Sequence, residues 1–248
     1  MRLIARLDIK GENLIKGLQF EGLRILGDPN KFALEYYKRG IDEIFFVDTV
    51  ASLYGRNNLT EIIARASENI FVPITAGGGI RNLQDAKNIF NSGADKIFLN
   101  TYAIKNPKLI TELVDYYGSQ SIVVSIEAKR TLNNQWECYT LGGREKTGIN
   151  LLNWVEKIHQ LKAGEIFLTS IDNDGLMNGL NKELFEIVSK KCDLPLMFGG
   201  GFKNENDLKD LNFTSCDGIF IGSSLHYKKV NIEKIKSYYN ESKKNCNN

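Results

Sequence analysis

The stretch VPITAGGGI at residues 72–80 recurs as LPLMFGGGF at residues 194–202. In both copies a proline lies at the start of a short apolar run, and three glycines close it. Gly77 and Gly199, the first glycines of the two copies, are 122 residues apart in a chain of 248 residues. A repeat of about half the chain indicates a fold built from two similar halves.

The same spacing relates other apolar runs of the kind that form buried β-strands. Asp95 and Asp217 begin one matching pair of runs, Glu43 and Glu165 begin another, and both pairs are again 122 residues apart. A fourth pair, RLDIK and SIEAK, is offset by 119 residues. Eight strands are predicted in all, at residues 2–8, 43–48, 72–77, 96–100, 121–128, 165–172, 194–199 and 218–223.

Segments of helical period separate these runs. The clearest is NLQDAKNIFNSG at 82–93, where Asn82 is placed to cap the helix and Gly93 to end it. Eight β-α units in about 250 residues are typical of a (β/α)8 TIM barrel. An open doubly wound sheet is the alternative, but strands that recur in order favour two fused half-barrels.

The predicted fold class is therefore α/β, a TIM barrel made of two half-barrel repeats. We expect residues 1–248 to form one domain, with half-barrels at about 1–120 and 121–235 and a polar tail at 236–248. The last residues, ESKKNCNN, are expected to be disordered.

Composition excludes several classes of function. The formal net charge is only +2, too small for the broad attraction that non-specific nucleic-acid binding needs. No apolar run has the length of a membrane span and the N-terminus lacks a signal-peptide layout, so a cytoplasmic protein is expected. Four separated cysteines and two histidines predict neither a metal site nor a disulfide framework, and no cofactor is expected.

Residues that end the strands of such a barrel line its catalytic mouth. Asp8 ends the first strand and Glu127 the fifth, so the two carboxylates should face each other across the mouth. Such a pair works as general acid and general base when the surroundings separate the two pKa values. The alternative is that each carboxylate caps a neighbouring loop.

Two glycine-rich turns follow the third and seventh strands, and exposed backbone N–H groups of this kind bind phosphate. Their occurrence at matching places in both halves suggests a substrate with a phosphate at each end. Lys16, in the loop at 14–29, is the cation expected to reach over a phosphate, unless it is merely a solvated loop lysine. The candidate phosphate-binding residues are Gly79, Asn100 and Thr101 for one end, and Gly201, Gly222 and Ser223 for the other.

Charged residues begin four strands at the opposite end of the predicted barrel. Two are basic and two acidic, and they could form a closed ring of ion pairs on the barrel floor, although solvated strand ends are the alternative. The four are Arg2, Glu43, Lys96 and Glu165.

Taken together, the motifs resemble the cyclase-subunit family of imidazole glycerol phosphate synthase over about residues 1–235. The motifs that carry this resemblance include RLDIK, KGLQFEGLRILGDP, DEIFFVDTVAS, PITAGGGI, GADKIFLNT, YTLGGREKTGI and GEIFLTSIDNDG. A related barrel, the phosphoribosylformimino isomerase of histidine biosynthesis, is less similar because the KGLQFEGLR loop and the floor charges are typical of the cyclase.

The resemblance implies that a glutaminase docks on the floor and that its ammonia crosses the barrel axis to a bisphosphate substrate at the mouth. By resemblance, Asp8 is the essential aspartate, the four floor charges form a gate, and Asp95 is a docking contact. Further substrate-site positions implied by the resemblance are Lys16, Asp48, Asp174 and Gly175.

Three positions depart from the family pattern, all at the mouth. Glu127 replaces an aspartate, Leu176 a threonine and Asn181 an aspartate. The extra methylene of Glu127 moves its carboxylate by about 1 Å, and a shift of that size lowers rates by about a hundredfold. Two hypotheses remain: a cyclase of histidine biosynthesis, or a paralogue that passes glutaminase-derived ammonia to an amidotransferase building acetamidino sugars.

Overall fold

The computed structural model describes residues 1–51, 59–209 and 216–246, the last few of these by their backbone only. The strands of the barrel wall run in chain order and all pair in parallel. They are β1 (Arg2–Lys10), β4 (Glu43–Asp48), β5 (Ile74–Gly77), β6 (Lys96–Leu99), β7 (Ile122–Arg130), β10 (Glu165–Ser170), β11 (Leu196–Gly199) and β12 (Gly218–Ile221).

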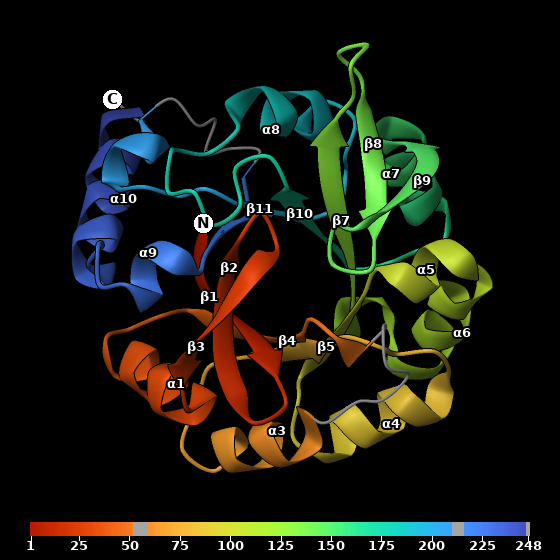
Figure 1. The fold of residues 1–248 in the computed structure, drawn as a ribbon, viewed down its shortest axis with the longest axis horizontal. Coiled ribbons are helices and arrows are strands. Elements are labelled where there is room, and N and C mark those ends of the chain that lie inside the picture. The colour runs from red at the N-terminus through yellow and green to blue at the C-terminus, as the bar shows by residue number, and fades with distance from the viewer. Residues whose placement is uncertain (52–58, 210–215, 247–248) are drawn as a thin grey trace.

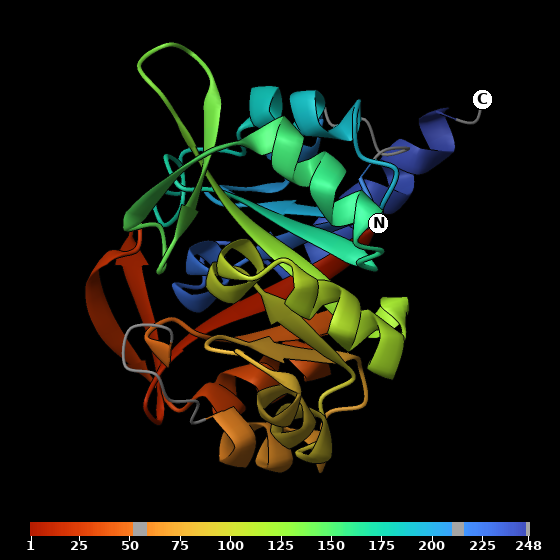
Figure 2. The same ribbon diagram turned by 90° about the vertical axis from the view of Figure 1, so that its right-hand side faces the viewer.

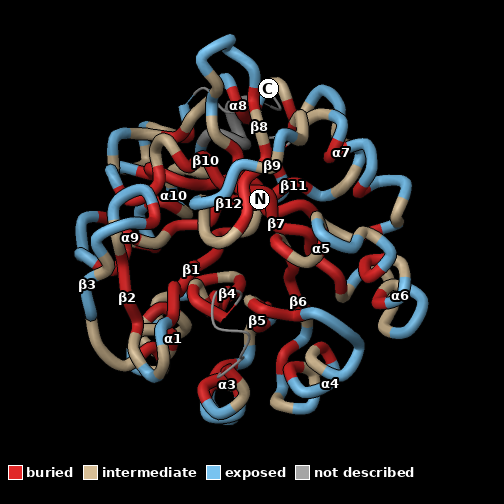
Figure 3. Tube along the Cα trace, turned by 45° about the vertical axis from the view of Figure 1, so that its right-hand side comes forward, coloured by how far each residue is buried: buried red, intermediate tan, exposed pale blue. Residues whose placement is uncertain are grey.

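These eight strands close on themselves. The pairing order is β10, β11, β12, β1, β4, β5, β6 and β7, and a further β10–β7 pairing completes the circle. Helices surround the strands in Figure 1, and buried residues concentrate on the inner wall in Figure 3. The predicted (β/α)8 barrel is confirmed, and the open doubly wound sheet is excluded by the closing pair.

The helices form where the sequence supplies an apolar face and a cap. In α4, Asn82 accepts a hydrogen bond from the Asp85 backbone, and Gly93 follows the last turn with a φ of +103°, as predicted. The helices are α1 (Pro29–Lys38), α3 (Leu59–Ser67), α4 (Leu83–Asn91), α5 (Thr101–Lys105), α6 (Lys108–Tyr117), α7 (Leu151–Gln160), α8 (Lys182–Ser189), α9 (Ser223–His226) and α10 (Ile232–Cys246), with short 3₁₀ turns at Ser119–Ser121 and Glu205–Leu208. No described helix has the length and hydropathy needed to cross a membrane.

The disorder expected for ESKKNCNN is wrong for most of that segment. Helix α10 continues to Cys246, and the buried side chains of Ile232 and Ile235 anchor its first turn. Residues 247–248 lie outside the described part of the chain.

Two hairpins extend the mouth and were not predicted as strands. The expected loop at 14–29 is largely the antiparallel pair β2 (Asn13–Leu18) and β3 (Glu21–Gly27), and β8 (Trp136–Thr140) pairs with β9 (Glu145–Asn150). One follows β1 and the other β7, the first strands of the two halves. Figure 2 shows both hairpins at the end of the barrel opposite the N-terminus. They place Lys16 and Gly143 over the mouth.

Alternate residues of each wall strand point into the barrel, which gives its interior a layered order. Along β1 the inward series is Arg2, Ile4, Arg6 and Asp8. The middle of the barrel is a separate apolar cluster, distinct from the core between strands and helices. It consists of Ile4, Phe45, Val47, Phe98, Val123, Phe167, Met197 and Phe220.

Candidate active site

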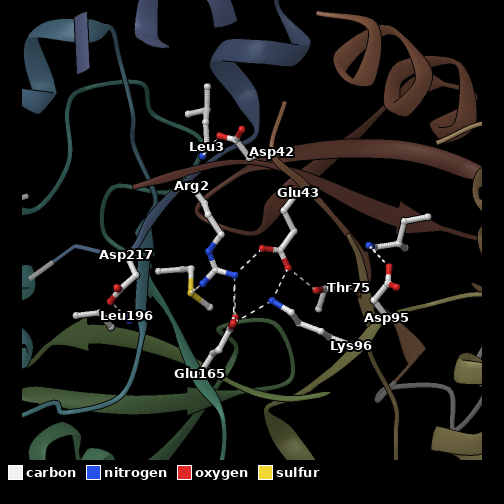
Figure 4. Close-up of polar contacts among 12 residues, drawn as sticks. Arg2, Leu3, Asp42, Glu43, Thr75, Asp95, Lys96, Glu165, Leu196 and Asp217 are labelled. Carbon is white, nitrogen blue, oxygen red and sulfur yellow. Dashed lines mark hydrogen bonds and ion pairs between the residues drawn. The ribbon is translucent and has the colours of Figure 1, made fainter. Parts of the chain in front are cut away.

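The floor of the barrel holds the four charged residues predicted there, and they form a closed ring of ion pairs (Figure 4). Arg2 Nη1 donates to Glu43 Oε2 at 2.8 Å and to Glu165 Oε1 at 3.1 Å. Lys96 Nζ donates to Glu43 Oε1 at 3.1 Å and to Glu165 Oε1 at 2.9 Å. Each cation therefore bridges both carboxylates. The four charges are an ion-pair ring and not separately solvated strand ends.

Glu43 is the most buried member of the ring. Its side chain is 0% exposed, and Thr75 Oγ1 donates a further hydrogen bond to it at 2.8 Å. Arg2 Nη2 also lies 3.0 Å from Met197 Sδ, so the ring rests directly on the apolar layer above it.

Replacing Glu43 by Gln should lower the free energy of unfolding by about 3 kcal/mol, because two cations would then face one carboxylate in a largely buried site. Urea unfolding would measure the loss. The matched control is Glu35→Gln, which removes a half-exposed partner of Arg39 at 3.8 Å and should change the free energy by less than about 0.5 kcal/mol. Equal effects of the two changes would contradict a buried ring.

Four phenylalanines fill the barrel axis above this ring. The Phe167 ring stacks on Phe220 at 3.8 Å and on Phe45 at 4.5 Å between centroids, and Phe98 lies 6.1 Å from Phe45. Phe45 and Phe167 occupy repeat-related positions, as do Phe98 and Phe220. The four rings, called here the phenylalanine layer, separate the floor from the mouth.

A buried guanidinium that the sequence analysis missed lies on the phenylalanine layer. Arg6 is 4% exposed, and its charged group lies 5.9 Å above Phe167 and 5.8 Å above Phe220. Its Nε donates to Asp8 Oδ1 at 2.8 Å. The signal was present in the sequence, because Arg6 precedes Asp8 by two residues and therefore shares its inward face.

Asp8 lies at the centre of a buried charge network at the mouth. Lys16 Nζ donates to Asp8 Oδ2 at 2.7 Å and to Asp174 Oδ2 at 3.0 Å. Burial raises the pKa of the Asp8 carboxyl, but the neighbouring charges of Arg6 and Lys16 lower it by more and hold it well below its usual range. Asp8 is therefore ionised at every working pH. Lys16 is not a solvated loop lysine.

Glu127 has the opposite electrostatic character. Its Oε2 accepts a hydrogen bond from the Gly143 backbone at 2.7 Å, and burial raises the pKa of its carboxyl to about 7, against the lowering effects of Arg6 and of that bond. The environments thus push the two carboxyl pKa values apart. This is the separation that distinguishes a base from an acid in one site.

The mouth contains two recesses, one for each predicted group of phosphate-binding residues. The first, about 520 Å³ including its open part, contains Gly79, Asn100 and Thr101 beside Asp48 and Glu127 in its lining. Asn100 Oδ1 is buried there without a hydrogen-bond partner among the described residues. An unpaired buried acceptor of this kind is available to a ligand.

The second recess, about 300 Å³, is lined on its phosphate-binding side by Gly201, Gly222, Ser223 and Ser224. Gly175, Lys16 and Asp174 also line this recess. The hydroxyls of Ser223 and Ser224 are buried and make no hydrogen bond within the described part of the chain. Gly201 adopts a φ of +91°, and a Cβ there would lie 2.6 Å from the Gly179 carbonyl oxygen, so a side chain cannot be accommodated.

Other predicted positions are held by local structure. Asp48 accepts hydrogen bonds from the backbones of Val50 and Ala51, and Asp95, on the floor, from the backbone of Ile74 (Figure 4). Of the departures from the family pattern, Asn181 caps α8 and Leu176 is 38% exposed. Residues that line the second recess include Gly175 and Met177 but not Leu176. In the described ranges, no three His, Cys, Asp or Glu side chains are grouped to hold a metal ion.

Comparisons with known proteins agree with this architecture. A family model described as "Histidine biosynthesis protein" matches residues 2–231. The chain is 53% identical to the imidazole glycerol phosphate synthase subunit HisF of Legionella pneumophila over 201 residues, 81% of this chain and 95% of the relative. It is 40% identical to HisF of Prochlorococcus marinus strain MIT 9515, over 96% of this chain and 94% of the relative, and 39% identical to HisF of Thermococcus onnurineus, over 97% and 95%. The chain therefore belongs to the histidine biosynthesis protein family, as a member of its imidazole glycerol phosphate synthase cyclase-subunit group.

Proposed function

We propose that this chain is the cyclase subunit of a glutamine-dependent imidazole glycerol phosphate synthase. It joins ammonia from a partner glutaminase to phosphoribulosyl-formimino-aminoimidazole carboxamide ribotide. The products are imidazole glycerol phosphate and aminoimidazole carboxamide ribotide. One observation carries the proposal: Asp8 and Glu127 have pKa values pushed apart, Glu127 lines the first recess, and Asp8 is paired with Lys16, which lines the second.

The chemistry follows from the carboxyl groups. Asp8, permanently ionised, is suited to accept a proton as ammonia attacks. Glu127, partly protonated near neutral pH, is suited to donate one to the departing group. Lys16 and the backbone amides hold the phosphate ends, so that the reacting atoms stay between the carboxyls.

The ring of charges on the barrel floor favours the docking of a partner glutaminase at that end, opposite the mouth. Arg2, Glu43, Lys96 and Glu165 surround the axis there, and the exposed Asp95 lies beside them. In this proposal ammonia enters through the ring and moves along the axis. The phenylalanine layer lies across that path, so its rings must turn aside for each molecule of ammonia.

The double substitution Arg2→Ala with Lys96→Ala tests the partner and the gate. Glutamine-dependent turnover should fall at least about tenfold more than turnover with added ammonium, because ammonium reaches the mouth directly from solvent. The comparison needs the purified complex of both subunits and both nitrogen sources. Equal losses with glutamine and with ammonium would contradict the gate.

A second candidate function is favoured by the cation at the base of the mouth. Arg6 engages Asp8 directly and Glu127 stands in place of an aspartate, whereas the floor ring is complete. In this alternative the chain conducts glutaminase-derived ammonia to an amidotransferase that builds acetamidino sugars, and has little cyclase activity. Turnover of the histidine-pathway bisphosphate with excess ammonium at alkaline pH, followed by ultraviolet absorbance, separates the two. Turnover supports the cyclase, and its absence in a folded protein that still activates a glutaminase supports the alternative.

A further inference from the structure

Arg6 has more hydrogen-bond donors than the protein satisfies. A guanidinium carries five N–H groups. In the structure Nε donates to Asp8 and Nη1 donates to Thr169 Oγ1 at 3.2 Å. The remaining three N–H groups, including both on Nη2, have no acceptor among the described residues. Because Arg6 lines the recesses of the mouth, these groups are available to an acceptor that is not part of the chain.

The remaining N–H groups of Arg6 lie where the two recesses of the mouth meet. Arg6 lines the first recess and also the second, and within the described part of the chain it is the residue that the two have in common. It therefore stands at the partition between the two recesses. A ligand with one end in each recess must pass over this guanidinium.

Aromatic contacts fix the guanidinium in this place. Phe167 and Phe220 support it from below, and Phe20, in the turn between β2 and β3, lies 5.3 Å from it on a third side. Such contacts suit the flat guanidinium better than the compact ammonium of lysine. The side chain is thus preorganised and loses little freedom when a ligand binds.

We propose that Arg6 is a substrate-binding residue that donates hydrogen bonds to a carbonyl or carboxylate oxygen in the middle of a ligand whose two phosphate ends occupy the two recesses. The inference rests on the proposed bisphosphate substrate and deepens it. It makes Arg6 a specificity residue, selecting among bisphosphates those with an acceptor between the ends. The alternative is that Arg6 serves only to pair with Asp8.

A matched pair of probes separates these roles. One probe is an alkanediol bisphosphate long enough to span the recesses, and the other is the same chain with a carboxylate at its centre. Calorimetric titration of the full chain should show roughly ten- to hundredfold tighter binding of the carboxylate probe, the range for a charge-assisted pair of hydrogen bonds. In Arg6→Gln this preference should disappear, while the affinity for inorganic phosphate stays within about threefold.

Two further variants keep the test decisive. Arg6→Lys retains the charge beside Asp8 but not the planar fork, so the protein should fold and the preference should fall by most of its value. Arg130→Gln, which removes an exposed cation paired with Glu183, controls for the loss of one positive charge and should keep the full preference. The proposal is overturned if the wild-type protein binds both probes equally, or if Arg6→Gln retains the preference.

Failure of the inference and failure of the proposed function give different results. A preference for the carboxylate probe without turnover of the histidine-pathway bisphosphate would reject the cyclase and leave the role of Arg6 intact. In a protein that does turn over, Arg6→Lys should raise KM at least tenfold and lower kcat less. A lower kcat with a shifted pH profile and an unchanged KM would mean that Arg6 acts only through Asp8, and would reject the inference.

Discussion

Replacing Asp8 by Asn should lower kcat with saturating ammonium at least about a thousandfold. Asp8 is held between Arg6 Nε at 2.8 Å and Lys16 Nζ at 2.7 Å, which keep it ionised and fix its direction. An amide has the same shape but cannot accept a proton, and general acid-base groups contribute roughly 10²–10⁴ in rate. Initial rates from the ultraviolet absorbance of the substrate would measure the change.

The control for this prediction is that the Asp8→Asn variant still binds the substrate. The substitution Asp8→Asn would leave Arg6 and Lys16 facing each other without their shared carboxylate, so some loss of stability is expected as well. Calorimetric titration of the substrate without ammonium should show binding within about tenfold of wild type, on protein shown to be folded by its thermal transition. Asp85→Asn, which weakens an ion pair with Arg81 outside the charge network of the mouth, should keep the turnover of the wild type. A kcat within tenfold of wild type in Asp8→Asn would remove Asp8 from the mechanism.

The sequence was sufficient to predict the barrel because the pattern of strands and turns in its first half recurs in its second half. Each wall strand is a buried run with turn residues after it, and the offset of 122 residues links runs that are too short to identify alone. The two hairpins were missed for a physical reason. The segments NLIKGL and EGLRILG are interrupted by glycines and charged residues, so neither alternation nor an apolar run marks them as strands.

The site was only partly predictable. Asp8 and Glu127 were predicted to end their strands, where barrel geometry assigns residues to the mouth; β1 and β7 in fact continue to Lys10 and Arg130, because their last residues pair with the two hairpins. Arg6 and the phenylalanine layer lie inside strands, where Phe is expected on either face and one Arg does not reveal what it contacts. The separation of the pKa values of Asp8 and Glu127 depends on which cations come within 3 Å, and that requires the fold.

The interior is an ordered series of layers with different chemistry. The ionic ring on the floor is followed by the phenylalanine layer, then by Arg6, and then by the carboxyls and the two recesses. The layer that would meet a glutaminase contains every charge that the family resemblance implies, while the departure Glu127 lies in the layer that would meet the substrate. In the proposed function, ammonia delivery and substrate choice therefore depend on different layers of one barrel.

The pH dependence of turnover should identify which carboxyl is the acid. With the concentration of free ammonia held constant, kcat should fall about tenfold per pH unit above pH 7, because burial raises the pKa of Glu127 to about 7 and the protonated form is the donor. Glu127→Gln should lower kcat by roughly 10²–10³ and abolish this slope. A rate that rises through pH 7 would instead make Glu127 the base.

Two companion measurements isolate Glu127 from the rest of the site. Glu127→Asp should also lower kcat, by about a hundredfold, because the shorter side chain withdraws its carboxyl from the Gly143 N–H, 2.7 Å away in the wild type. The local structure thus favours Glu at this position, where the family has Asp. Wild-type activity in Glu127→Asp would contradict this.

The pH dependence of the free energy of unfolding gives an independent test of the protonation state of Glu127. Glu127 has a folded pKa of about 7 against its usual 4.5, so between these values the folded chain binds more protons than the unfolded chain and stability falls as pH rises. His226 opposes this trend, because burial lowers its pKa from 6.5 to about 4 and stability then rises with pH over that interval. Glu127→Gln removes only the first effect. Its free energy of unfolding, measured in urea, should therefore gain roughly 3 kcal/mol relative to wild type between pH 4.5 and pH 7, and a constant difference would mean that Glu127 is ionised throughout.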